Sequence, residues 1–174
     1  MKSEKIYKIS LTAIFTALVF CATYFIAIPM PAGFGYVNLG DAFVLLSAWI
    51  LGPLGCICAG VGSALADLLL GYAIYAPETL IIKALMCLLG FFVFNALKAL
   101  KGYSFRFIIS AFVAECVMVL GYFLFEGVLY GFATSVVNIP FNLVQGGLSL
   151  VIANVVVNIL YANKTVRKFM AFAK

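Results

Sequence analysis

Long apolar runs, interrupted by short turn-forming stretches, dominate the 174-residue chain. A helix needs about 20 apolar residues to cross a membrane core of roughly 30 Å. On this basis the pattern predicts six spans, of which the second is short. The predicted spans are residues 6–28, 41–53, 54–71, 77–97, 105–130 and 137–161. The sequence PMPAGFG, from Pro29 to Gly35, ends the first span, and Pro77 suits the first turn of the fourth.

Such spans must satisfy their own backbone hydrogen bonds in lipid, so the pattern predicts an all-α fold. No internal repeat or second domain is apparent, and we expect one six-helix membrane domain over residues 1–174. Composition agrees, since 66% of the residues are hydrophobic, only 10% are charged and the mean hydropathy is +1.20. An average soluble domain has about 25% charged residues. The chain is therefore expected to be an integral membrane protein.

The distribution of lysine and arginine predicts the orientation. Ten of the eleven basic residues lie before the first span, between the fourth and fifth, or after the sixth. They are Lys2, Lys5, Lys8, Lys98, Lys101, Arg106, Lys164, Arg167, Lys168 and Lys174. The other three loops hold none, so the positive-inside rule places both termini in the cytoplasm. The net charge of +5 is then an orientation signal in a lipid bilayer, and we expect no nucleic-acid partner.

Polar residues inside the spans indicate a binding site, because a charge within a membrane costs at least about 2.5 kcal/mol. The stretch GSALADLLLGYAIYAPETLIIK, from Gly62 to Lys83, has three ionisable residues, and Asn138, Asn142 and Gln145 lie along one face of the sixth helix. We expect a pocket open to the outside, formed mainly by helices three to six and covered by the loop before Asp41. The predicted ligand-binding residues are Asn38, Asp67, Tyr75, Glu78, Lys83, Glu115, Asn142 and Gln145.

A flat heteroaromatic ligand suits such a pocket, because rings stack on aromatic side chains while a few polar groups fix orientation. Lys83 is predicted to donate to a ligand oxygen. The alternative is a structural ion pair between Lys83 and Asp67. Likewise, Asn142 and Gln145 are either ligand contacts or hydrogen bonds between helices, and the outer tyrosines are either pocket residues or an interfacial belt.

Other chemistry is largely excluded by the residues present. The chain has no histidine, so it has no histidine-based catalytic triad or histidine metal site. It has no G-x-x-x-x-G-K-[ST] phosphate loop of its own. Its five cysteines lie in or beside apolar spans and read as small buried hydrophobes. We therefore predict no catalytic residues, no metal and no cofactor.

Small residues form a stripe on the first helix. Ala13, Ala17 and Cys21 recur every four residues, a spacing that lets another helix approach closely. The partner helix lies either in another protein or inside the same bundle.

Several of these features together resemble the substrate-binding S components of energy-coupling factor (ECF) vitamin transporters. They are the six helices with cytoplasmic termini, the Ala-x-x-x-Ala of Ala13 and Ala17, the sequence YVNLGDAFVLL, and the stretch from Gly62 to Lys83. The last two motifs are similar to those of the branch that includes transporters for riboflavin, pyridoxine and hydroxymethylpyrimidine. The resemblance covers nearly the whole chain.

This resemblance implies a subunit of the prokaryotic plasma membrane that captures a small vitamin outside. It implies a complex with a transmembrane T component and two cytoplasmic ATPases, with Ala13 and Ala17 as docking residues and the loop of Asn38 as a gate. Charge-assisted hydrogen bonds favour pyridoxine or hydroxymethylpyrimidine slightly over riboflavin. The competing hypotheses are a stand-alone secondary transporter or channel, in which the carboxylates and Lys83 relay ions, and a small membrane enzyme.

Overall fold

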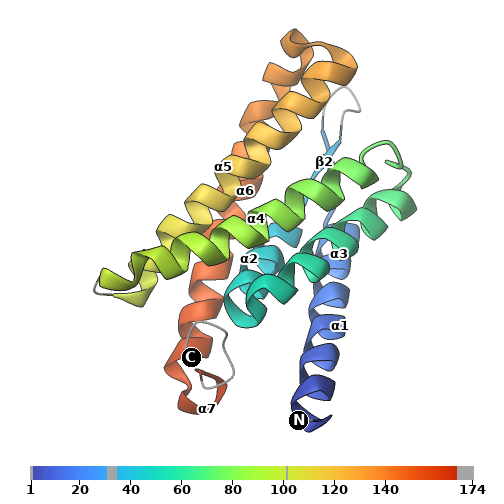
Figure 1. Cartoon of the computed structure of the whole chain (residues 1–174). Helices are drawn as coiled ribbons and strands as arrows, with labels where there is room; N and C mark the ends of the chain where they lie inside the picture. The colour runs from blue at the N-terminus through green and yellow to red at the C-terminus, as the bar shows by residue number, and fades with distance from the viewer. Residues whose placement is uncertain (1, 31–34, 101, 168–174) are drawn as a thin grey trace.

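A computed structural model of the chain describes residues 2–30, 35–100 and 102–167, and it is a bundle of helices with one short hairpin (Figure 1). The elements in order are α1 (Lys2–Phe25), β1 (Ile28–Pro29), β2 (Tyr36–Val37), α2 (Gly40–Leu51), the 3₁₀ turn η2 (Gly52–Leu54), α3 (Gly55–Leu70), α4 (Ala76–Ala96), the 3₁₀ turn η3 (Leu97–Ala99), α5 (Tyr103–Tyr130), α6 (Phe132–Ala162) and α7 (Lys164–Arg167). The predicted all-α membrane bundle is confirmed.

The helix bounds differ from the approximate predicted spans at several ends. The first helix ends at Phe25, and Ile28 belongs to β1, which pairs antiparallel with β2. The fifth and sixth helices begin at Tyr103 and Phe132, before the predicted residues 105 and 137. In the predicted break PMPAGFG, residues 31–34 lie outside the described part of the chain, as do the basic residues Lys101, Lys168 and Lys174.

The second predicted span, residues 41–53, does not cross a membrane by itself. Helix α2 has 12 residues, or about 18 Å at 1.5 Å per residue, against a core of roughly 30 Å. The turn η2 joins it to α3, and the two form one apolar stretch, Gly40–Leu70, among the five that are long and apolar enough to cross within the described residues. Helix α2 is thus a half-length helix inside the bundle.

The two ends of the described chain lie at the same end of the bundle (Figure 1). This arrangement agrees with the orientation predicted from the basic residues.

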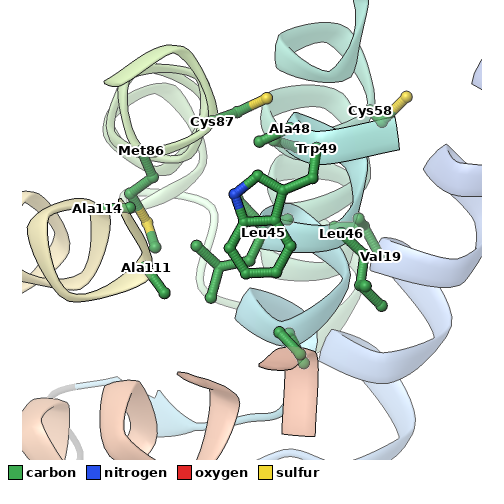
Figure 2. Close-up of a cluster of buried hydrophobic side chains, with 14 of the residues drawn as sticks. Val19, Leu45, Leu46, Ala48, Trp49, Cys58, Met86, Cys87, Ala111 and Ala114 are labelled. Atoms are coloured by element: carbon green, nitrogen blue, oxygen red, sulfur yellow. The ribbon is translucent and has the colours of Figure 1, made fainter. Parts of the chain in front are cut away.

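Helix α2 forms the centre of the core. Trp49 is fully buried, its ring centroid lies 4.8 Å from that of Phe107, and its Nε1 donates to Ser110 Oγ at 3.1 Å. Figure 2 shows Trp49 among side chains from α1, α2, α4 and α5. The indole nitrogen therefore has a partner in an apolar interior, which removes the cost of burying it.

Two glycines permit close approach of the backbones around this core. A Cβ on Gly55 would lie 2.5 Å from the carbonyl oxygen of Ser47, at the corner between α2 and α3. A Cβ on Gly62 would lie 2.8 Å from the carbonyl oxygen of Thr16, where α3 crosses α1. Small residues on α3 thus serve packing inside the bundle.

The small-residue stripe on α1 lies on the surface, unlike the small residues of α3, which pack inside the bundle. Ala13, Ala17 and Cys21 are all exposed, while Phe15 and Val19 form the buried face of α1. The alternative that this stripe packs inside the bundle is therefore wrong.

We predict that Gly55→Ala destabilises the protein, because the new methyl group would overlap backbone atoms of Ser47. Overpacking of this kind costs about 1–3 kcal/mol of unfolding free energy. The measurement is thermal melting of the purified protein in detergent. Gly147→Ala is the matched control, since a Cβ there would meet no atom within 4 Å. Equal melting temperatures for the two variants would contradict the close packing at the corner.

Candidate functional site

A polar site lies where the segment after β2 meets α2, α4 and α6. It encloses a cavity of about 30 Å³. A buried water needs roughly 10–15 Å³ by this measure, so the cavity is smaller than a heteroaromatic ring. The lining residues are Thr23, Met30, Gly35, Tyr36, Asn38, Ser63, Asp67, Tyr72, Tyr75, Thr79, Lys83, Tyr122, Glu126, Asn142 and Gln145.

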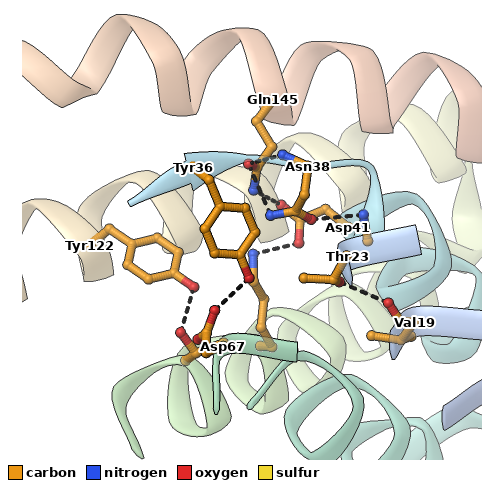
Figure 3. A network of polar contacts seen from close by, with 11 residues as sticks. Val19, Thr23, Tyr36, Asn38, Asp41, Asp67, Tyr122 and Gln145 are labelled. Atoms are coloured by element: carbon orange, nitrogen blue, oxygen red, sulfur yellow. Dashed lines mark hydrogen bonds and ion pairs between the residues drawn. The ribbon is translucent and has the colours of Figure 1, made fainter. Parts of the chain in front are cut away.

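The Asp41 network consists of Asn38, Asp41, Lys83 and Gln145, and Figure 3 shows Asn38, Asp41 and Gln145 close together at the site. Asp41 is fully buried on the first turn of α2, where Lys83 Nζ of α4 lies 2.5 Å from its Oδ1. Gln145 Nε2 of α6 donates to the other oxygen, Oδ2, at 2.6 Å. The backbone N–H of Asn38 donates to Gln145 Oε1 at 2.9 Å. The network therefore ties the segment after β2 to three helices.

A second contact involves Tyr36 of β2. Its hydroxyl donates to Asp67 Oδ1 of α3 at 2.5 Å, and Asp67 Oδ2 is buried without a hydrogen-bond partner among the described residues. Burial, followed by the neighbouring Asp67 carboxylate, raises the pKa of Tyr36 far above its usual range. The hydroxyl therefore keeps its proton and remains a donor, and Asp67 retains one unused, buried acceptor beside the cavity.

Aromatic rings line the outer part of the site. The rings of Tyr36 and Tyr72 lie 5.0 Å apart, and those of Tyr72 and Tyr75 lie 6.2 Å apart. Tyr122 lies beneath the ammonium group of Lys83, which is 5.3 Å from the ring centroid. Ring faces and charged groups thus share one cavity.

The structure brings together six of the eight predicted ligand-binding residues, namely Asn38, Asp67, Tyr75, Lys83, Asn142 and Gln145. Glu78 is half-buried in the first turn of α4 and does not line the cavity. Glu115 lines a different cavity, between α5 and α6. The alternative ion pair was wrong, because Lys83 bonds to Asp41 and not to Asp67.

The predicted ligand-binding set left out several residues that the structure places in or beside the site, among them Tyr36, Asp41, Tyr122 and Glu126. Asp41 is the most informative of them. It stands three residues after Asn38 and opens an apolar helix, which is the signal that could have identified it.

Comparisons with known proteins identify the family to which this chain belongs. The family model for the ECF-type riboflavin transporter S component matches residues 3–162, so the chain belongs to this family of membrane-embedded, substrate-binding transporter subunits. S components bind small vitamins, are not enzymes, and work with a T component and ATPases in the plasma membrane. Because the chain belongs to a family of transporter subunits that work with a T component and ATPases, this membership replaces the two competing hypotheses, a stand-alone transporter or channel and a small membrane enzyme.

Among individual relatives, an uncharacterized protein of Pyrococcus woesei is 38% identical over 132 residues, which cover 75% of this chain and 85% of that protein. The thiamine precursor transporter HmpT of Lactococcus lactis is 30% identical over 158 residues, covering 89% of this chain and 88% of that protein. A solved structure of the S component of a bacterial ECF transporter matches with a TM-score of 0.69 at 20% identity, over 91% of this chain and 97% of that one. That structure supports the fold alone.

We predict that Lys83→Met destabilises the protein by about 3–5 kcal/mol, because it leaves the buried Asp41 carboxylate without its counter-ion. Adding Asp41→Asn should restore most of the loss, since the neutral amide no longer needs a cation. The measurement is thermal or chemical unfolding of the three proteins.

The matched control is Lys83→Met with Asp67→Asn, which leaves Asp41 charged and should not recover stability. Recovery by this control would mean that Lys83 serves Asp67 in solution.

Proposed function

We propose that this S component captures a compact nitrogen heteroaromatic vitamin or vitamin precursor of the hydroxymethylpyrimidine or pyridoxine kind, and delivers it inward with a T component and two ATPases. The observation that carries the proposal is the composition of the site, in which two carboxylates, a lysine and three amides line a small space beside tyrosine rings. Such a ligand offers ring nitrogens and hydroxyls to these groups and a flat face to the rings.

The thiamine precursor transporter among the relatives supports a small pyrimidine substrate. The family description supports riboflavin, a larger and neutral molecule. Because the cavity measures only about 30 Å³, even the smaller ligand requires the site to open, and riboflavin requires a larger rearrangement.

Opening would proceed through the Asp41 network. Gln145 of α6 holds the backbone of Asn38, which belongs to the segment after β2, and both residues line the cavity. A ligand that bonds to Asp41, Lys83 or Gln145 replaces contacts that the protein otherwise makes with itself. In this proposal the segment Tyr36–Leu39 is the gate, and the ligand exchanges one set of hydrogen bonds for another.

Asp67 is the residue that we expect to be free for the ligand. Its Oδ1 is occupied by Tyr36, while its buried Oδ2 has no partner among the described residues. A ring amine or hydroxyl that donates to this oxygen would satisfy a group whose burial is otherwise unfavourable.

We predict that Asp67→Asn weakens binding of hydroxymethylpyrimidine by about 1.5–3 kcal/mol, the range for a hydrogen bond to a charged group. The measurement is calorimetric titration of the purified protein with hydroxymethylpyrimidine, pyridoxine and riboflavin. Glu78→Gln is the control, because Glu78 does not line the cavity, and its affinity should match that of the unmodified protein. Tight binding of riboflavin alone would overturn the proposed substrate class.

A second prediction concerns the T component. Ala13→Leu and Ala17→Leu should abolish vitamin uptake by cells while leaving the vitamin affinity of the isolated protein unchanged, because both alanines lie on the exposed face of α1. Ala133→Leu, at an exposed alanine in the first turn of α6, is the control and should keep uptake. Loss of affinity in the α1 variants would contradict a docking role.

A further inference from the structure

A second cavity lies between α5 and α6, outside the site described above. It measures about 340 Å³, within the roughly 300–1,000 Å³ of ligand pockets. Its lining residues are Phe112, Glu115, Cys116, Val119, Leu120, Phe123, Ile139, Leu143, Gly146, Gly147 and Leu150. Nearly all of these are apolar, and one is a carboxylate.

That carboxylate, Glu115, is only 6% exposed, and neither of its oxygens has a hydrogen-bond partner among the described residues. Gly146 makes room for it, since a Cβ at Gly146 would lie 3.0 Å from Glu115 Oε2 and 3.2 Å from its Cβ. A buried carboxyl group without a partner is costly. The group is thus held against a glycine of α6, behind the wall of an apolar cavity, with its acceptor capacity unused, and a ligand in the cavity reaches its oxygens when the side chain turns toward it.

The Asp41 network does not satisfy Glu115. Lys83 is already 2.5 Å from Asp41 Oδ1, and its charge is used there. Among the described residues, Glu115 therefore lacks a dedicated counter-ion.

The open side of the cavity faces outward from the bundle. Phe112, Leu120 and Leu143 on its wall are 61%, 57% and 59% exposed, respectively. In a membrane-spanning bundle this surface contacts lipid chains, so a ligand reaches the cavity from within the bilayer. It must therefore dissolve in lipid.

We propose that the α5–α6 cavity binds a lipophilic amine, whose nitrogen donates to the Glu115 carboxylate and whose apolar body packs against the aromatic and aliphatic wall. An ammonium group supplies the charge and donors that Glu115 lacks, and a charge-assisted hydrogen bond is stronger in an apolar site than in water. If the carboxyl group is neutral before binding, its proton passes to the amine nitrogen, and no other proton source is needed.

The test uses three probes of one shape: 1-aminoadamantane, 1-adamantanol and adamantane. Their binding to the purified full-length protein in lipid nanodiscs is measured by equilibrium dialysis against empty nanodiscs. We expect saturable binding of the amine at least tenfold tighter than that of the alcohol, and no saturable binding of the hydrocarbon. Glu115→Gln should remove the preference for the amine.

Two further variants keep the proposal falsifiable. Gly147→Leu extends a side chain from the cavity wall, where a Cβ meets no atom within 4 Å, and should block the amine while Glu115 is intact and vitamin binding persists. Glu78→Gln removes a carboxylate that does not line the cavity and should bind the amine normally. Equal binding of all three probes, an amine preference that survives Glu115→Gln, or amine binding that survives Gly147→Leu would each overturn the proposal. Each result leaves the vitamin site unaffected, so the two functions are tested separately.

Discussion

The burial of Asp41 is the constraint on which the site depends. A fully buried carboxylate in a membrane protein must have partners, and Asp41 draws them from Lys83 of α4 and Gln145 of α6. Gln145 then holds Asn38. One charge at the start of the half-length helix α2 therefore positions the gate segment and two helices at once, and the apolar packing around Trp49 holds α2 in place beneath it.

The sequence predicted the fold class and the residues of the site better than it predicted their pairing. Spacing along α6 put Asn142 and Gln145 on one face, and both line the cavity. Pairing depends on the distance between helices, which periodicity does not contain. Lys83 therefore had two carboxylates of similar apparent depth available, and the three-dimensional approach of α2 to α4 selected Asp41.

The errors have physical reasons too. Apolar length alone suggested that residues 41–53 cross the membrane, but α2 ends at Leu51 and the chain turns at Gly52–Leu54, where Gly55 lets α3 pack closely against the Ser47 carbonyl. Glu115 and Glu78 were assigned to the vitamin site because charges in spans tend to face a cavity. That rule holds for Glu115, yet the cavity that it faces is a different one. The rule identifies a charged residue that faces the inside of the protein, but it does not indicate which cavity the residue lies beside.

Trp49 gives this protein an internal optical reporter. It is the single tryptophan of the chain, its indole is fully buried, and its hydrogen bond to Ser110 and its contact with Phe107 join α2 to α5. Indole emission depends on the polarity and hydrogen bonding of its surroundings, so its wavelength records whether that junction is intact. Any rearrangement that moves Asp41 together with α2 should therefore change the fluorescence of Trp49, without an attached dye. Trp49 lies near the C-terminal end of α2, whereas Asp41 and the gate segment lie at its N-terminal end.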